Sequence, residues 1–442
     1  MSLCRNRFIL PFILPVATFA AAIFTGSLLL AWSGAAASAP IPYIDAFFIA
    51  TSAVCVTGLA SVDIATAFNA FGQWTILVLV QLGGLGITTY STLILYLASH
   101  RISLTDKLAV GEALLNDPSF HLGKFLQRIV LVILTLEFTG AYLLHFLDPE
   151  RIPAFPALFL SVSAFCNAGF ALWSDSLVSW QHHAGVTSVV MLLIIFGGLG
   201  FAVLDESLRL AKARLARRLG RGKDALPLPR LSFHARLVWR TTAFLILAGT
   251  LLLILPEYFA NDSAPTSVPE LFLPSLFQSV AARTAGFNTV AVSRMADVSL
   301  LALILLMLVG GSPGSCAGGL KTTTFRILVA FAAAQLRGRS QITVNGKAID
   351  PASCNKAFIL LVFTLLAVSG AVFLLALTEG GSNPHGDTPF QLFDLLFEAV
   401  SAFATVGLTT DVTPRLSTAG KLIDCALMYI GRLGPIWLIT TI

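Results

Sequence analysis

The sequence predicts an all-α polytopic membrane protein: four helix–pore loop–helix repeats, with eight spanning helices, around a central pseudo-fourfold ion pathway. Two observations lead to this fold class. Of the 442 residues, 56% are hydrophobic and 12% are charged, and the mean hydropathy of +0.84 is far too high for a soluble chain of several domains. One stretch, residues 48–63, also recurs three times at intervals of roughly 110 to 120 residues.

The four recurring stretches share a register that is fixed by one glycine in each. These glycines are Gly58, Gly169, Gly286 and Gly407. Alanine stands five positions before each glycine, and serine stands six positions before it in every stretch except the third, which has Val280. A shared register of this length indicates an internal repeat.

Each stretch follows a proline and a short apolar run, which predicts a helix of about twelve residues, too short for a bilayer that needs about 20. Such a helix must enter the membrane and return. Irregular backbone at membrane depth survives only where it is buried in protein or lines a water-filled cavity, so four such turns indicate a central aqueous path. Because glycine allows unusual carbonyl directions, the turns can form rings of carbonyls that replace the water shell of a cation.

The three residues that end at each glycine are therefore the predicted ion-binding filter, through their carbonyl groups. They are Val56, Thr57 and Gly58; Asn167, Ala168 and Gly169; Thr284, Ala285 and Gly286; and Thr405, Val406 and Gly407.

Polar connectors separate the repeats. We expect repeat 1 at residues 1–98, repeat 2 at 122–204, repeat 3 at 236–336 and repeat 4 at 356–442, with cytoplasmic connectors at 99–121, 205–235 and 337–355. In repeat 1, spans at residues 8–32 and 71–97 flank the re-entrant helix, and the glycine-dense QLGGLG at 81–86 favours close helix packing over contact with a solute. In repeat 2, Glu137 lies in mid-helix, where a carboxylate needs a partner or a cavity.

The last helix of repeat 3 is interrupted at residues 310–324, GGSPGSCAGGLKTTT, and we expect such a break in only this one of the four last helices. A helix broken by glycine, proline and serine at membrane depth is typical of a transport path, so we predict an intramembrane gate. Its GGLKTT resembles a phosphate-binding loop, but Leu320 separates the glycine from Lys321, which argues against nucleotide binding. A fixed kink that serves subunit packing is the alternative.

Arg432 is expected near the centre of the last helix of repeat 4, too deep to reach the surface, so it should face the cavity or a partner. The alternative is a structural arginine that backbone carbonyls satisfy elsewhere. The predicted gating residues are Gly310, Gly311, Ser312, Pro313, Gly314, Ser315, Gly318, Gly319, Lys321 and Arg432.

Charge distribution predicts the orientation in the membrane. Of the 28 Lys and Arg residues, 22 lie in four regions: two at the N-terminus, four in 101–128, ten in 209–240 and six in 321–356. Positive residues mark the cytoplasmic side, so both termini should be cytoplasmic in a multi-pass protein of the inner (plasma) membrane. The six cysteines have no paired spacing, so disulfides and structural zinc are not expected. No cluster of acid, base or metal groups suggests an enzyme, and no bound cofactor is expected.

Taken together, VCVTGL in the first repeat, RTAGFNT and GGSPGSCAGGLKTTTF in the third and ATVGLTT in the fourth resemble the Trk/Ktr/HKT superfamily of potassium transporters. The resemblance covers nearly the whole chain, and eight spanning helices without an extra N-terminal pair are most similar to the Ktr membrane subunit. It implies one filter glycine per repeat, a gating loop at residues 310–324 and an arginine in the last helix at Arg432. Glycine at all four filter positions favours K⁺ over Na⁺.

The resemblance also implies a homodimer with one pore per subunit, seated on a cytoplasmic ring of nucleotide-binding regulatory subunits, and it allows Na⁺ as a coupling or activating ion. The expected function is K⁺-selective uptake. The alternative is a secondary transporter that binds a small organic solute in its broken helices, but four equivalent re-entrant turns suit a dehydrated monatomic ion better.

Overall fold

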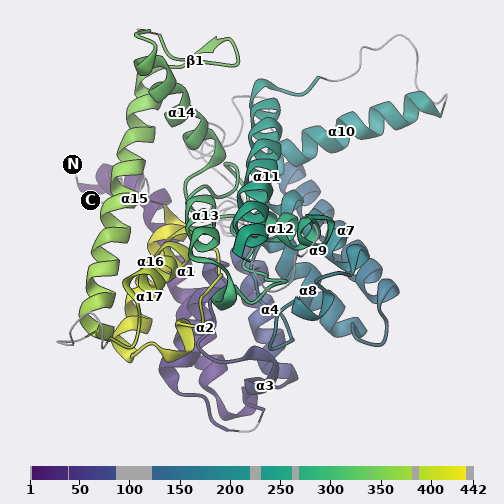
Figure 1. Cartoon of the computed structure of the whole chain (residues 1–442), viewed down its shortest axis with the longest axis vertical. Coiled ribbons are helices and arrows are strands. Elements are labelled where there is room, and N and C mark those ends of the chain that lie inside the picture. The colour runs from purple at the N-terminus through teal and green to yellow at the C-terminus, as the bar shows by residue number, and fades with distance from the viewer. Residues whose placement is uncertain are drawn as a thin grey trace.

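The computed structural model describes residues 2–37, 39–85, 122–219, 230–260, 268–339, 341–380 and 388–434. This part of the chain is predominantly helical, with one short β-hairpin (Figure 1). The predicted connector at 99–121 and the second half of the predicted span at 71–97 lie outside the described residues.

Four successive segments follow the same order of a long helix, a short helix and a last helix. Segment 1 has α1 (Ser2–Ala31), η1 (Ser33–Ala35), α2 (Tyr43–Cys55), α3 (Ile64–Ala67) and α4 (Ala70–Gly84). Segment 2 has α7 (Leu122–Leu147), α8 (Ala154–Cys166), η2 (Val178–Trp180), α9 (Ala184–Gly198) and α10 (Phe201–Arg218). Segment 3 has α11 (Phe233–Ala260), α12 (Val268–Ala281), η3 (Val292–Arg294), α13 (Asp297–Met307) and α14 (Thr322–Leu336). The antiparallel strands β1 (Thr343–Val344) and β2 (Lys347–Ala348) precede segment 4, which has α15 (Pro351–Gly380), α16 (Leu392–Ala404), η4 (Thr413–Arg415) and α17 (Thr418–Leu433).

The four short helices, α2, α8, α12 and α16, form the core. Each packs against the long helix that precedes it. Each also buries one phenylalanine completely at a matching position: Phe48, Phe159, Phe277 and Phe397. The phenylalanine stands ten residues before the filter glycine in three segments and nine before it in the third, so α12 is one residue out of step with the others.

The last helix of each segment packs against the short helix of the next segment, and in segments 1, 2 and 4 it also packs against the short helix of its own segment. Contacts join it to the short helix of its own segment in α2–α4, α8–α9 and α16–α17, and to that of the next segment in α4–α8, α9–α12, α13–α16 and α17–α2. Glycine permits the first kind of contact, because a Cβ atom on Gly83, Gly197 or Gly431 would collide with the carbonyl oxygen of Val54, Phe165 or Phe403 respectively. The close packing expected for residues 81–86 is therefore present at Gly83. The second kind of contact closes the four segments into a ring.

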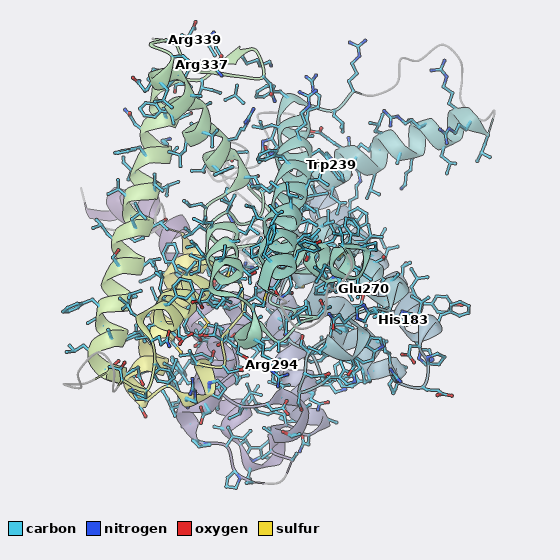
Figure 2. All side chains as sticks on the ribbon, viewed as in Figure 1. His183, Trp239, Glu270, Arg294, Arg337 and Arg339 are labelled. Carbon is cyan, nitrogen blue, oxygen red and sulfur yellow. The ribbon has the colours of Figure 1, made fainter. Side chains whose placement is uncertain are left out.

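Within the described residues, three helices are long and apolar enough to cross a membrane: residues 127–147, 233–259 and 351–380. The bent pair α9–α10 raises the number to four. Figure 2 places Arg337 and Arg339 at the end of the molecule that carries the hairpin, and Arg294 and His183 towards the opposite end. The complete set of eight spans remains a prediction.

Several predicted boundaries differ from the structure. The connector expected at 205–235 begins as helix α10, which bends by 115° from α9 and extends away from the body of the molecule (Figure 1). An ion pair of 2.5 Å between Arg209 and Asp205 supports this helix, and the Trp239 indole (labelled in Figure 2) joins it to α11 by donating to Ser207 at 3.0 Å. Helix α15 begins at Pro351, inside the connector expected at 337–355.

Candidate functional site

The four filter glycines stand in four turns of the same backbone geometry. Two residues before each glycine the chain adopts the left-handed conformation, at Val56, Asn167, Thr284 and Thr405, with φ between 51° and 71°. The glycines themselves have φ of 99°, 73°, 77° and 94° in chain order. Two left-handed positions in three residues reverse the chain sharply, and glycine adopts the second without steric cost.

The turns meet one another edge to edge and close into a ring. A Cβ atom on Gly58 would lie 3.0 Å from the Cα of Gly169, and the corresponding atom on Gly407 would lie 3.0 Å from the Cα of Gly58. A Cβ atom on Gly169 would lie 3.0 Å from the Cα of Gly286, and one on Gly286 would lie 3.2 Å from the Cα of Gly407. The structure therefore brings all four filter turns together, although up to 349 residues separate them in sequence (407 minus 58).

Four carbonyl oxygens, one from each turn, lie at the junctions of this ring. Each belongs to the residue before a glycine and meets the Cβ position of the glycine in the preceding turn: Ala168 O at Gly58, Ala285 O at Gly169, Val406 O at Gly286 and Thr57 O at Gly407. A side chain at any of these glycines would displace a carbonyl. The four turns thus place one carbonyl oxygen acceptor at each junction between neighbouring turns.

Hydrogen bonds to the preceding short helices fix the conformation of these turns. Backbone N–H groups of Thr57, Ala168 and Val406 donate to the carbonyls five residues earlier, at 2.7 to 2.8 Å. The hydroxyls of Ser52 and Ser401 accept from the N–H groups of Gly58 and Gly407 at 3.0 and 3.1 Å. The N–H groups of these turns are therefore engaged by the helices that precede them.

The third turn is held differently. The N–H of Ala285 donates to the carbonyl four residues earlier, at Ala281. Val280 stands six positions before Gly286, where segments 1 and 4 have a serine whose hydroxyl accepts from the glycine N–H. Arg283 is buried beside this turn and donates to the carbonyl of Gly310 at 3.4 Å. Sequence reasoning did not identify Arg283, although the RTAGF motif contains it. The buried Arg283 joins the third turn to the start of the predicted gating loop.

The loop at residues 310–324 lies against the filter turns. A Cβ atom on Gly318 would collide with the Thr405 hydroxyl, and one on Gly310 would lie 3.2 Å from the Thr284 methyl. A Cβ atom on Gly319 would lie 3.4 Å from the Cβ of Ala404. The glycines therefore allow the loop to approach two of the four turns more closely than a larger residue could.

The loop is also joined to the junction between α9 and α10. Ser312 and Cys316 donate backbone N–H groups to the carbonyls of Gly198 and Gly197, and Phe201 at the start of α10 donates to Gly314 at 3.0 Å. Pro313 O lies where a Cβ atom of Gly200 would stand. The expectation that one last helix alone is broken is wrong, because the last helix of segment 2 also breaks here, at Leu199 and Gly200, where φ is 88°.

Arg432 and Lys321 bind the loop through its carbonyls. Arg432 donates to Cys316 O in the loop and to Gly83 O in α4, and the Lys321 ammonium donates to Ala317 O at 2.6 Å. The hydroxyls of Ser312 and Thr322 lie 3.0 Å apart and close the base of the loop. Ser315 is buried within it and accepts from the Ala317 N–H at 3.3 Å. Arg432 stands in the last turn of α17, which ends at Leu433; residues 435–442 of the predicted last helix lie outside the described residues.

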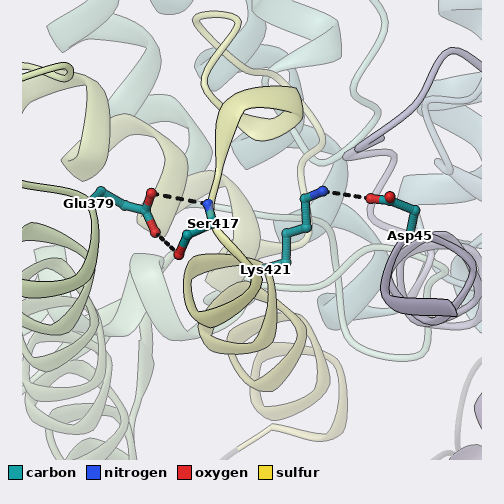
Figure 3. A network of polar contacts seen from close by, with 4 residues as sticks. All are labelled: Asp45, Glu379, Ser417 and Lys421. Atoms are coloured by element: carbon teal, nitrogen blue, oxygen red, sulfur yellow. Dashed lines mark hydrogen bonds and ion pairs between the residues drawn. The ribbon is translucent and has the colours of Figure 1, made fainter. Parts of the chain in front are cut away.

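Two further groups of polar contacts, around Glu137 and at the start of α17, were not identified from the sequence. Glu137, whose partner the sequence did not show, accepts from the Gln81 amide at 3.3 Å and from the Cys166 thiol at 3.8 Å. The Lys421 ammonium of α17 donates to Asp45 of α2 at 2.6 Å, and Ser417 at the start of α17 bonds to Glu379 (Figure 3). The contacts of Gln81 with Glu137 and of Lys421 with Asp45 join different segments, which explains why periodicity alone could not pair them.

The chain matches the sequence profile of a family described as "TrkH: Cation transport protein" over residues 10–442. A predominantly helical chain with apolar helices and this match is, by class, a membrane cation transport protein.

Several relatives agree with this class. The chain is 35% identical over 407 residues to "Ktr system potassium uptake protein B" of Bacillus subtilis, covering 90% of this chain and 85% of that protein. It is 36% identical to the protein of the same name from Vibrio alginolyticus (89% and 83%) and 33% identical to "Potassium/sodium uptake protein NtpJ" of Enterococcus hirae (93% and 88%). The fold resembles the crystal structure of the potassium transporter TrkH from Vibrio parahaemolyticus, with a TM-score of 0.71 and 18% identity over 97% of this chain and 84% of that one. The chain belongs to the TrkH family.

Proposed function

We propose that this chain takes up K⁺ across the cell membrane as the ion-translocating subunit of a Ktr/Trk-type system. The observation that carries the proposal is the closed ring of four glycine turns, with one carbonyl oxygen at each junction. Such oxygens can replace the hydration shell of K⁺ without any charged ligand. The names of the relatives, which refer to potassium uptake, support the same substrate.

The proposal includes four helix–pore loop–helix repeats with eight spans, with the boundaries given above apart from the corrected helix ends. It places the basic end, with Arg337 and Arg339, in the cytoplasm. A homodimer and a cytoplasmic regulatory ring belong to the proposal too, supported by the word "system" in the relatives' names and by the family resemblance. Na⁺ is included as a candidate coupling or activating ion, since one relative is named for both cations.

The loop at residues 310–324 is proposed as the gate. Its contacts with Thr405 and Thr284 put it next to the ring, and its bonds to Gly197, Gly198 and Phe201 attach it to α9 and α10. Because α10 extends away from the body, a cytoplasmic partner that moved this helix would pull directly on the loop.

Rescue of K⁺-uptake-deficient cells at low external K⁺ tests the function. Cells that express the chain together with the regulatory subunit of its own system should grow, and Rb⁺ or K⁺ uptake should be measurable in them. Addition of Na⁺ at constant K⁺ tests coupling or activation. Growth no better than that of cells with an empty vector, despite confirmed membrane expression, would contradict the proposed function.

Arg432→Ala should increase K⁺ flux. The guanidinium holds the loop through Cys316 O, and hydrogen bonds of a charged group contribute about 1.5–3 kcal/mol each. Loss of one bond that exists only in the closed state should favour opening by about tenfold. The measurement is initial K⁺ uptake per folded protein, with the exposed Arg294→Ala as control. A folded Arg432→Ala protein with lower flux would favour the purely structural role.

A further inference from the structure

Helix α17 buries a stripe of residues at four-residue spacing, and an aspartate stands within it. The stripe is Gly420, Asp424, Met428 and Arg432. Gly420 approaches Glu379 of α15, and the adjacent Gly431 approaches the Phe403 carbonyl of α16. Helix α17 packs against α2, α15 and α16, and Asp424 has no exposed surface.

The carboxyl group of Asp424 has no cationic partner within the described part of the chain. Both of its oxygens are buried without a hydrogen-bond donor there. Lys421, three residues earlier, is engaged by Asp45 (Figure 3), and Arg432 donates to the carbonyls of Cys316 and Gly83. The two cations that α17 carries nearby are therefore committed to other groups.

The neighbouring charged groups are mostly acidic. Glu398 of α16, fully buried, and Glu379 of α15 are within electrostatic reach of Asp424. Both oxygens of Glu398 accept hydroxyl hydrogen bonds, from Thr413 and, at 2.7 Å, from Thr409. The titratable and charged groups on the elements packed around this site are Glu398 and Asp394 of α16, Glu379, Lys356 and Cys354 of α15, Tyr43, Asp45 and Cys55 of α2, and Lys421, Cys425, Tyr429 and Arg432 of α17.

We propose that Asp424 is a proton-binding site, occupied in the folded protein by a proton taken from the solution. An isolated carboxylate without a hydrogen bond costs so much free energy in a protein interior that it is neutralised instead, and neither Asp424 oxygen has a hydrogen-bond donor in the described part of the chain. A metal cation fits less well, because it needs several oxygen ligands, whereas the Thr409 and Thr413 hydroxyls already serve Glu398. A proton needs neither further ligands nor further space.

The site gives transport a dependence on pH, a consequence that rests on the proposed function. Asp424 belongs to α17, which packs against the short helix α16, and α16 ends at the proposed filter turn of Thr405 to Gly407. When the pH rises and the proton leaves, the Asp424 anion faces Glu398, and their repulsion should separate α16 from α17. The filter carbonyls of the fourth turn would move with α16, so K⁺ flux should fall.

Infrared spectroscopy of the purified protein in lipid tests the proton directly. The wild type at neutral pH should show the C=O stretch of a protonated buried carboxylic acid, and Asp424→Asn should lose one such band. Asp411→Asn, an exposed change in the same segment, should keep it. If Asp424→Asn does not fold, Asp424→Leu serves as the second variant, since a neutral acid should tolerate an apolar side chain of similar size. A spectrum that is unchanged in the folded variant would overturn the proposal. A wild-type spectrum without the band would overturn it too, and so would a melting temperature of the wild type that rises with NaCl.

Uptake measured in proteoliposomes tests the consequence. Wild-type K⁺ flux should fall by about tenfold as the pH rises through the range in which the band disappears. A tenfold change in flux corresponds to about 1.4 kcal/mol. Flux through Asp424→Asn should stay within about twofold, because its amide cannot ionise. Equal pH profiles in both proteins would refute the functional consequence. A protein that shows the band but transports no K⁺ would refute the proposed function and leave the proton site standing.

Discussion

Gly407→Ser and Gly58→Ser should each remove most of the preference for K⁺ over Na⁺. Both glycines have φ above 90°, where a residue with a Cβ is strained by about 1–3 kcal/mol. A Cβ atom at position 407 would also collide with Thr57 O, and one at position 58 would stand 2.5 Å from Ala168 O, so a ring carbonyl must move in either variant. A loss of about 1.4 kcal/mol in K⁺ binding relative to Na⁺ reduces the ratio about tenfold. Competition of Na⁺ with Rb⁺ uptake measures it.

Gly338→Ser provides a matched control for these variants. Gly338 also has a positive φ, of 61°, but its Cβ position has no neighbour within 4 Å. This variant therefore carries the backbone strain without the displaced carbonyl, and its ion preference should equal that of the wild type. Unchanged selectivity in both Gly58→Ser and Gly286→Ser would show that the four turns are not the filter.

Deletion of residues 312–317 should make K⁺ flux faster and insensitive to the regulatory partner, with ion preference retained. The deleted residues include the N–H groups that bind Gly197 and Gly198 and the carbonyl that binds Arg432, so the loop would lose its attachments to α9 and α17. The filter turns keep their own hydrogen bonds to the short helices. Uptake rates with and without the partner, together with the Na⁺ competition, measure the outcome.

Shortening the exposed turn at Asn345 and Gly346, between β1 and β2, serves as the control deletion and should leave regulation unchanged. Each hydrogen bond lost with the loop costs about 1 kcal/mol, so the loop variant should be less stable but still fold. Size-exclusion chromatography reports on the assembly. Loss of the dimer or of folded protein would support the packing kink, and a stable variant with wild-type kinetics would disprove the gate.

The sequence was sufficient to locate the four turns because their geometry restricts which residue can stand there. A left-handed turn with a carbonyl directly beside it requires glycine, and Gly58, Gly169, Gly286 and Gly407 are therefore visible as a repeat before any contact is known. The short helices were predictable for a similar reason, since an apolar run of fixed length ends at each turn. Local chemistry determines both features.

Contacts between segments were not predictable in this way. The one-residue shift of α12 depends on where Phe277 packs, and the second broken helix at Leu199 and Gly200 depends on the loop that donates to its carbonyls. Arg283 and Asp424 have identities that the sequence shows, but whether a buried charge has a partner depends on which helices surround it. Tertiary packing decides these points, and a single sequence contains no record of it.

The contact between α17 and α2 sets a condition on how the protein is made. Lys421 and Asp45 are 376 residues apart, and the ring of short helices is incomplete until α17 reaches α2. During synthesis, the first three segments can enter the membrane and pack against one another, yet Gly407 and Val406 O are still missing from the ring. The proposed ion pathway is therefore unfinished until the fourth segment has been translated and inserted.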